Sequence, residues 1–335
     1  MKKIPVGILG ATGMVGQKFV ELLTYHPWFE IVALAASDRS IGKTYEMTTG
    51  RKMILSPCIP NLPCKIVFSG LDSSVAGEIE EQFARAGYGV ISNARNHRMN
   101  THVPLIIPEV NSDHLKLIQY QKWGNGFIVT NPNCSVIGIS MALKPLHDQW
   151  VIESVNAVTL QALSGAGYPG VPSMDILDNI IPFIEGEEAK IECEPLKIMG
   201  NFQLDQVIPA DIRLSAQCNR VSVSDGHLAC LSIKLKKKAT KKDIIESWKN
   251  FKSEPQKLQL PSAPNNPIVY CEYEAHPQPK THRNHQNGMG VAIGRLRECS
   301  LFDWKCVILS HNRVRGAAGG AILIAELMLS MNMIG

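Results

Sequence analysis

Glycine recurs at every third residue near the start of the chain, at Gly7, Gly10, Gly13 and Gly16. Residues 4–10 form an apolar run that is too short for a typical helix and predicts a buried strand. Glycine between a strand and a helix lets backbone N–H groups approach a pyrophosphate, and the helix N-terminus adds partial positive charge. The spacing therefore predicts a nucleotide-binding turn. It is not the literal G-x-G-x-x-G, so a tight turn that binds nothing is the alternative interpretation.

The first 130 residues alternate between strand-like and helix-like segments. A helical stretch runs from Met14 to about Tyr25. Four further apolar runs predict strands, at residues 29–34, 66–68, 89–91 and 127–129. Strands separated by helices in this way predict a parallel, doubly wound sheet of the Rossmann-like type.

The segment after the second predicted strand bears on the choice of nucleotide. An acidic residue at this place commonly holds the ribose of NAD, whereas this chain has Ser37, Arg39 and Ser40, with Lys43 close behind. Basic and hydroxyl groups there favour a 2′-phosphate, and so NADP over NAD. Asp38 lies among them and argues in the opposite direction.

The pattern changes after about residue 150. Partly alternating segments predict strands at residues 151–160, 221–223, 228–235 and 289–295. Such alternation is typical of a larger, half-exposed sheet. The end of the chain, residues 316–335, mixes polar and apolar positions at helical spacing, and it predicts a packing helix rather than a membrane span.

Composition narrows the class of protein. The length of 335 residues suits one large or two ordinary domains, and 45% hydrophobic residues exclude general disorder. A net charge of only +4, spread along the chain, gives no reason to expect a nucleic-acid or membrane partner. Nine cysteines without regular spacing or a C-x-x-C pair are typical of a reducing compartment, so we expect a cytoplasmic protein.

One cysteine has a distinctive context. Cys134 follows a predicted strand and precedes a helix-like segment, residues 136–143. We expect the helix dipole to stabilise its thiolate at the carboxyl edge of the sheet, exposed to a ligand. A thiolate attacks an aldehyde, and the hemithioacetal can transfer a hydride to a nicotinamide and become a thioester. Taken alone, the alternative of a packed, inert cysteine is stronger.

Five segments together carry a resemblance to a known family. They are residues 10–16 (GATGMVG), 131–135 (NPNCS), 161–167 (QALSGAG), 219–227 (an Asn-Arg-Val and a Gly-His) and 315–320 (RGAAGG). In this order they resemble aspartate-semialdehyde dehydrogenase, and the spacing is similar to its archaeal and fungal-type branch. The resemblance runs from about residue 4 to about residue 330.

The resemblance implies a fold and an activity. It implies a Rossmann domain of residues 1–133 plus 313–335, and an α+β catalytic and dimerisation domain of residues 134–312 with a large mixed sheet. The implied enzyme is a phosphorylating oxidoreductase that acts on an aldehyde with NADP as acceptor. In biosynthesis of Lys, Thr, Met and Ile it converts L-4-aspartyl phosphate to L-aspartate 4-semialdehyde through a thioester on Cys134. Inorganic phosphate is the co-substrate, no metal is needed, and the chain forms a homodimer or homotetramer.

The resemblance also implies catalytic roles. Cys134 is the nucleophile and His227 the general acid and base, a role that suits a group titrating near neutrality. Gln161 orients the reacting carbonyl. Arg220 binds the substrate α-carboxylate, for which a bidentate guanidinium is well suited.

Further residues are assigned to substrate and cofactor in the same way. Glu194 holds the substrate amine, Lys197 and Arg98 contact phosphate with Arg95 as a competitor, and Asn133 lies near the phosphate. The cofactor contacts implied are Gly10, Thr12, Gly13, Met14, Val15, Ser37, Arg39, Ser40, Ser164, Gly165 and Asn312. Small residues at 164–167 permit close approach of the nicotinamide ring.

A histidine-rich segment, residues 276–285, also raises the hypothesis of a metal site. Proline interrupts its spacing and no nearby cysteine was identified, so a solvated loop is the favoured interpretation.

Three other functions remain open from the sequence. N-acetyl-glutamyl-phosphate reductase shares the cysteine–histidine logic but lacks an amine-binding acid, and residues 133–135 fit it poorly. Reduction of an acyl-CoA such as malonyl-CoA is a second alternative. A regulator that binds NADP without turnover is a third, and the joint presence of Cys134, Gln161, Arg220 and His227 argues against it.

Overall fold

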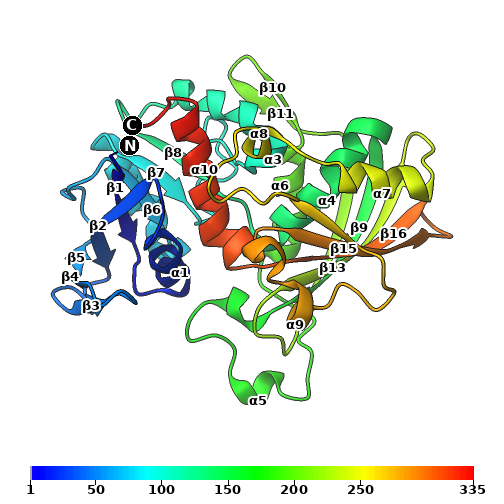
Figure 1. Cartoon of the computed structure of the whole chain (residues 1–335), viewed down its shortest axis with the longest axis horizontal. Coiled ribbons are helices and arrows are strands. Elements are labelled where there is room, and N and C mark those ends of the chain that lie inside the picture. The colour runs from blue at the N-terminus through cyan, green and yellow to red at the C-terminus, as the bar shows by residue number, and fades with distance from the viewer. Residues whose placement is uncertain (1) are drawn as a thin grey trace.

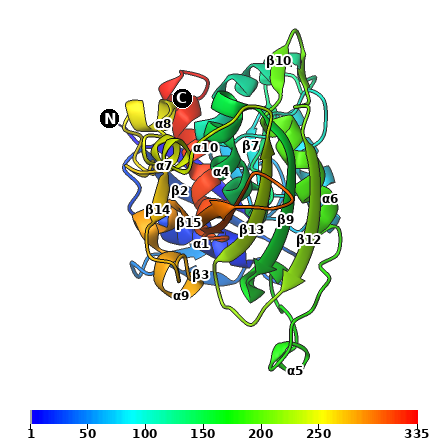
Figure 2. The ribbon, with the colours of Figure 1, turned by 90° about the vertical axis from the view of Figure 1, so that its right-hand side faces the viewer.

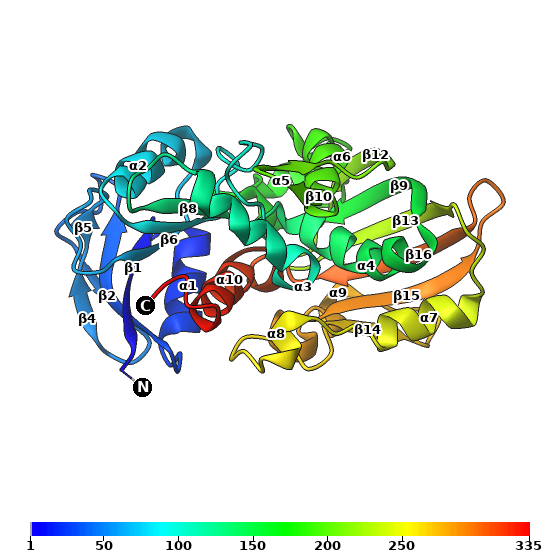
Figure 3. The ribbon, with the colours of Figure 1, turned by 90° about the horizontal axis from the view of Figure 1, so that it is seen from above.

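The structure, a computed structural model, describes residues 2–335 and contains two six-stranded sheets (Figures 1 and 3). The first has the strand order β5-β2-β1-β6-β7-β8, and all its pairs are parallel. Its strands are β1 (Ile4–Leu9), β2 (Phe29–Ala36), β5 (Ser56–Pro57), β6 (Ile66–Ser69), β7 (Gly89–Ser92) and β8 (Phe127–Thr130). The predicted parallel, doubly wound sheet is confirmed.

The nucleotide-binding turn lies where the strand order of this sheet reverses. Helix α1 (Met14–Leu23) follows β1, and helix α2 (Ser73–Arg85) follows β6. Gly10 has a positive φ of 75°, and a Cβ atom on it would lie 2.8 Å from the carbonyl oxygen of Gly70. Only glycine fits this close approach of two turns. Ligands of open α/β sheets bind at such a reversal point, outside the carboxyl ends of the strands.

The second sheet is mixed, with the order β12-β9-β13-β16-β15-β14. Its strands are β9 (Ile152–Gln161), β12 (Arg213–Arg220), β13 (His227–Leu235), β14 (Ile268–Cys271), β15 (Val291–Glu298) and β16 (Trp304–Ser310). The pairs β12–β9 and β14–β15 are parallel, and the others are antiparallel. The strands predicted at 151–160, 228–235 and 289–295 are present, whereas residues 221–223 form a loop that follows β12.

Helices cover one face of the second sheet. They are α4 (Cys134–Trp150), α6 (Glu187–Ile198) and α7 (Lys241–Lys249). Figure 2 looks onto the other face, where outward side chains of β9 and β13 are partly exposed in alternation with buried ones. The sheet is therefore half-exposed, as its alternating sequence predicts.

Short elements make up the connections. Two hairpins are formed by β3 (Thr44–Glu46) with β4 (Lys52–Ile54) and by β10 (Asn201–Gln203) with β11 (Gln206–Ile208). Single turns of helix are α3 (Pro108–Asn111), α5 (Ser173–Ile176), α8 (Glu254–Lys257) and α9 (Pro279–His282), and tighter turns are η1 (Ser112–Tyr120), η2 (Leu163–Ala166) and η3 (His285–Gly288). Within residues 2–335 no helix has the length and apolar character needed to cross a membrane.

The last helix joins the two halves. Helix α10 (Gly319–Ser330) runs between the sheets (Figure 3), and its side chains share a hydrophobic cluster with β1 and β2. A π-helical turn, η4 (Val314–Ala318), precedes it. There the Arg315 guanidinium makes a bidentate, fully buried ion pair with the Glu109 carboxylate, at 2.8 and 2.6 Å.

This ion pair gives a stability prediction. Glu109→Gln leaves the buried Arg315 charge uncompensated, and breaking a buried pair in this way costs about 3–5 kcal/mol of unfolding free energy. The change is measured as a shift in equilibrium denaturation by urea. Asp148→Asn removes the exposed Lys144–Asp148 pair and serves as the control, with an expected loss below about 1 kcal/mol. Equal shifts for the two variants would contradict the importance of the buried pair.

Candidate active site

Cys134 is the first residue of α4 and follows β8 by four residues. Asn133 caps this helix, and its Oδ1 accepts hydrogen bonds from the N–H groups of Ser135 (2.9 Å) and Val136 (3.3 Å). Because parallel strands carry ligands at their carboxyl edge, the thiol lies at the functional edge of the first sheet. It lines a cavity of about 270 Å³.

The second sheet brings three predicted residues to the same region. Gln161 is the last residue of β9, Arg220 the last of β12 and His227 the first of β13. Arg220 pairs in register with Gln161, and the residue after His227 pairs with Leu160. These side chains therefore lie together at the same end of three neighbouring strands. The structure brings Gln161 into the cavity with Cys134.

Turn η2 fixes the orientation of His227 and Arg220. The Ala162 N–H donates to Nδ1 of His227 at 3.1 Å, and Nη1 of Arg220 donates to the Ala162 carbonyl at 2.7 Å. Nε2 of His227 is buried and has no hydrogen-bond partner within residues 2–335. A Cβ atom on Gly165 would lie 2.9 Å from both His227 Nε2 and Arg220 Nη1. Gly165 lines the cavity, so both polar groups lie at the margin of the cavity.

This close contact predicts the effect of Gly165→Ala. The added methyl group displaces the imidazole and guanidinium ends, and misplacing catalytic groups by a fraction of an ångström lowers turnover, here by about tenfold. Steady-state kinetics measure the loss. Ala86→Ser, at an exposed position directly after α2 and outside the cavity, is the control and keeps activity. Unchanged kinetics in Gly165→Ala would show that these two groups do not act at this position.

The electrostatics of the free protein differ from the prediction. Burial, followed by the Glu187 carboxylate, raises the pKa of Cys134 to about 12. Burial and the Arg220 charge lower the pKa of His227 to about 3. The expectations of a stabilised thiolate and of a histidine titrating near neutrality are therefore wrong for the free protein, since desolvation outweighs the helix dipole. At pH 7 the two groups are a neutral thiol and a neutral imidazole.

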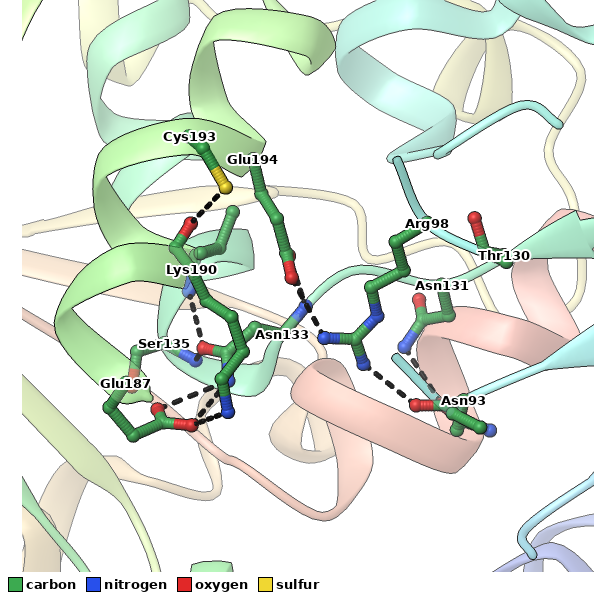
Figure 4. Close-up of polar contacts among 12 residues, drawn as sticks. Asn93, Arg98, Thr130, Asn131, Asn133, Ser135, Glu187, Lys190, Cys193 and Glu194 are labelled. Carbon is green, nitrogen blue, oxygen red and sulfur yellow. Dashed lines mark hydrogen bonds and ion pairs between the residues drawn. The ribbon is translucent and has the colours of Figure 1, made fainter. Parts of the chain in front are cut away.

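The structure brings an acid and a lysine into the cavity that the sequence analysis missed. Glu187 begins α6 and accepts hydrogen bonds from Asn133 Nδ2 (3.0 Å) and Gln161 Nε2 (3.1 Å), and it pairs with Lys190 (Figure 4). Burial acts to raise the pKa of Glu187, but Lys190 and these hydrogen bonds bring it below its ordinary value. Glu187 is therefore a charged carboxylate beside Cys134.

The residues predicted for these roles lie elsewhere. Both oxygens of Glu194 are occupied, by Arg98 Nη1 at 2.9 Å and by the Asn133 N–H at 2.8 Å. Nζ of Lys197 donates to three carbonyl oxygens, those of Arg98, Asn100 and Val103, each at 2.8 Å. Neither residue lines the cavity, and both are engaged in these hydrogen bonds, so the structure lends no support to their assignments to the amine and to phosphate. Their hydrogen bonds instead hold the segment that carries Arg98.

Arg98 is the better placed of the two candidate arginines. Its Nη2 donates to the Asn93 carbonyl at 2.7 Å, and Glu194 holds Nη1, so the guanidinium is fixed at the cavity wall (Figure 4). Arg95 also lines the cavity, but its side chain is exposed.

The predicted cofactor residues fall into two groups. Met14, Val15, Ser164, Gly165 and Asn312 line the cavity that holds Cys134. Asn312 links two segments, since its Nδ2 donates to Ser164 Oγ at 2.8 Å and its Oδ1 accepts from the Gly226 N–H at 2.9 Å.

The second group extends along the carboxyl edge of the first sheet. Gly10, Thr12 and Gly13 form the turn after β1, whose Gly10 N–H donates to the Ala35 carbonyl of β2 at 2.9 Å. Ser37, Arg39 and Ser40 come directly after β2 and lie outside the cavity. The two groups together make a path from the β2 end to Cys134.

This combination defines a class of enzyme. A nucleotide-binding sheet binds its cofactor at the carboxyl ends of its strands. Cys134 lies there, near His227 and Arg220 of the second sheet. That is the arrangement of a nicotinamide-dependent dehydrogenase that works through a covalent cysteine adduct.

Comparisons with known proteins identify the family. The family model described as semialdehyde dehydrogenase, NAD binding domain, matches residues 5–118, and the one described as semialdehyde dehydrogenase, dimerisation domain, matches residues 143–315. The aspartate-semialdehyde dehydrogenases of Archaeoglobus fulgidus and Schizosaccharomyces pombe are 46% and 47% identical, and each match covers 98% of this chain and 99% of the relative. A solved structure of aspartate semialdehyde dehydrogenase with NADP from Candida albicans has a TM-score of 0.90 and 40% identity, covering 99% of this chain and 100% of that chain. The chain belongs to the aspartate-semialdehyde dehydrogenase family.

Proposed function

We propose that this chain reduces L-4-aspartyl phosphate to L-aspartate 4-semialdehyde with NADPH and releases inorganic phosphate, as a step in biosynthesis of Lys, Thr, Met and Ile. Membership of the family supports this activity. The observation that carries it is the cavity that gathers Cys134, Gln161, Glu187, Lys190 and Arg98. Its charges suit an amino acid that bears a phosphate.

The charges divide between the two ends of the substrate. Arg220 binds the α-carboxylate, and Glu187 binds the amine, which needs a charged acceptor. Arg98 and Lys190 bind the phosphate, with Asn133 beside them. Gln161 donates to Glu187 and lines the same cavity as Cys134, and we assign it the orientation of the acyl group.

The glycine turn fits a dinucleotide. Gly13 at the N-terminus of α1 makes no side-chain capping bond, and the first turn has no acidic residue, so its N–H groups are available to phosphate oxygens. Ser37, Arg39 and Ser40 suit a 2′-phosphate, and Ser164, Gly165 and Asn312 lie beside the reacting centre. When bound, NADPH supplies the hydride that reduces the acyl group.

The chain's own residues perform the remaining chemistry. Sγ of Cys134 attacks the acyl carbon, the bond from that carbon to the phosphate oxygen breaks, and the thiol proton ends on the departing phosphate. The product is a thioester on Cys134. Because the Ala162 N–H occupies Nδ1 of His227, the neutral ring carries its proton on Nε2. It therefore donates to the carbonyl oxygen, which becomes negative during reduction.

Release of the aldehyde completes the cycle. As the hemithioacetal collapses, its hydroxyl proton returns to Nε2 of His227, its C–S bond breaks, and the Sγ thiolate takes up a proton from solvent. One proton is consumed for each aldehyde formed, so the reductive direction is favoured as pH falls.

The activity is tested in the oxidative direction. L-Aspartate 4-semialdehyde and NADP should give NADPH absorbance only when inorganic phosphate is present. N-acetyl-glutamate semialdehyde should give none, because its acylated nitrogen offers no charge to Glu187, and malonyl-CoA should not oxidise NADPH. Turnover of either of those compounds, with none of aspartate semialdehyde, would overturn the assignment.

Self-association accompanies this function in the proposal. We also propose that the chain divides at residues 133 and 313 into nucleotide-binding and catalytic domains. Within residues 2–335, the helices cover only one face of the second sheet and leave the other open (Figure 2). The arm around α5 extends from the body and exposes Tyr168, Met174 and Phe183 (Figure 1). Apolar groups at an exposed surface suit a subunit interface, and we propose a homodimer or homotetramer. Nine unpaired cysteines support a cytoplasmic location.

A further inference from the structure

The histidine-rich segment folds against a cysteine. Sγ of Cys271, at the end of β14, and ring nitrogens of His282 and His285 all lie within 4.8 Å of one another. Cys271 and His282 are buried and His285 is partly buried. The expectation that this segment has no cysteine nearby is therefore wrong.

We propose that Cys271, His282 and His285 bind a zinc ion, a site separate from the catalytic cavity. Thiolate and imidazole are the ligands that Zn²⁺ prefers, and bond lengths of about 2.3 Å to sulfur and 2.0–2.1 Å to nitrogen place tetrahedral donors roughly 3.4–3.6 Å apart. The donor atoms therefore need to approach one another by little more than 1 Å. Side-chain rotation of this size needs no rearrangement of the backbone.

The ring of His282 is held through Nδ1, which accepts from the Gln278 N–H at 3.1 Å and lies 2.6 Å from Thr281 Oγ1. On metal binding the ring takes the other tautomer, in which Nδ1 carries the proton and donates to the Gln278 carbonyl oxygen, 3.1 Å away. Metal-bound histidine usually donates its second ring N–H to such a carbonyl, which leaves Nε2 free for the ion.

A fourth ligand is available. The ring centroid of His276 lies 4.1 Å from that of His282, and the His276 side chain is partly exposed and can turn. The backbone admits this residue because position 294 is glycine, where a Cβ atom would lie 2.4 Å from the His276 carbonyl oxygen. One thiolate and three imidazoles complete a closed site, which is typical of a structural zinc ion.

The position of the site gives the ion a mechanical role. Arg283 follows α9, and its Nη1 donates to Ser224 Oγ and to the Asp225 carbonyl, each at 3.1 Å. These residues form the loop that leads to His227. A metal that joins β14 to His282 and His285 therefore braces the loop in front of His227 while remaining outside the cavity.

Cobalt titration of the metal-stripped full chain tests the site. Co²⁺ replaces Zn²⁺ and shows a thiolate-to-metal charge-transfer absorption when cysteine is a ligand. We expect one equivalent to bind with this absorption, and Zn²⁺ to displace it and raise the thermal unfolding temperature. Cys271→Ser should abolish the absorption, and His285→Ala should weaken binding at least about tenfold. Cys134→Ser and His102→Ala, which alter a thiol and a histidine elsewhere, should leave both unchanged.

Two results would overturn the proposal. One is failure of the unaltered chain to bind Co²⁺ or Zn²⁺ in a one-to-one ratio. The other is an absorption that survives in Cys271→Ser, or that disappears in Cys134→Ser, which would place the metal at another thiol. Circular dichroism of the metal-free variants shows that loss of binding does not reflect loss of the fold.

Discussion

Cys134→Ser should lower turnover by at least about 10⁴-fold, because removing the nucleophile of a covalent mechanism removes the reaction path itself. A hydroxyl group is a far poorer nucleophile than a thiol, and no general base with an elevated pKa lies beside it, since the pKa of His227 is lowered to about 3. Phosphate-dependent formation of NADPH measures the loss. Binding of NADPH, followed by its fluorescence, should be retained because the glycine turn is untouched.

Cys193→Ser is the matched control for that variant. Cys193 is also partly exposed and lies on α6 close to the site (Figure 4), but its Sγ only donates weakly to the Lys190 carbonyl at 3.9 Å. Activity of this variant should stay within about twofold of the unaltered chain, as for substitutions away from special features. Substantial turnover by Cys134→Ser, or its loss in Cys193→Ser, would move the nucleophile to another thiol.

The first sheet was predictable because its signals are local. Each buried parallel strand is a short apolar run that ends at a turn residue, and the glycine spacing marks the one turn where two loops approach closely. The second sheet was less so. Strand β12 carries exposed side chains at alternate positions near its start, and five of its eight residues are polar, so its apolar pattern is weak. Its pairing with β9, rather than its own sequence, makes it a strand.

The residues of the site differ in the same way: some were predictable from local sequence signals, and others depend on packing. Cys134, His227, Gln161 and Arg220 stood out because they occur at strand and helix ends within distinctive motifs. Glu187 and Lys190 did not stand out, because the pair Glu194 and Lys197 has the same spacing on the same helix. A helix turns about 100° per residue, so residues seven apart lie on similar faces. Only the packing of α6 decides that the first pair faces Cys134 and the second holds the Arg98 segment. The pKa shifts likewise depend on burial, which no spacing reveals.

Glu187→Gln tests which of the two acids, Glu187 or Glu194, binds the ammonium group of the substrate. Glutamine can keep the hydrogen bonds from Asn133 and Gln161, but it cannot hold a substrate ammonium group. Loss of a buried charge partner costs about 2 kcal/mol or more, so kcat/KM for L-aspartate 4-semialdehyde should fall at least about 30-fold. The loss should be much smaller for the analogue without the amine, succinate semialdehyde. Glu194→Gln should instead raise the KM for phosphate, through Arg98, and keep the preference for the amine.

Glu187→Gln should also make the Cys134 thiol more reactive, although it slows turnover of the enzyme. Glu187 is, after burial, the main cause of the raised pKa of Cys134, so removing its charge increases the thiolate fraction at a fixed pH. Alkylation of Cys134 by iodoacetamide at pH 7 should therefore be faster in Glu187→Gln than in the unaltered chain. If Glu187 had only a structural role, its replacement would lower both the rate of Cys134 alkylation and the rate of turnover. Slower alkylation, or a Glu194→Gln variant that alone loses the preference for the amine, would return the substrate's ammonium group to Glu194.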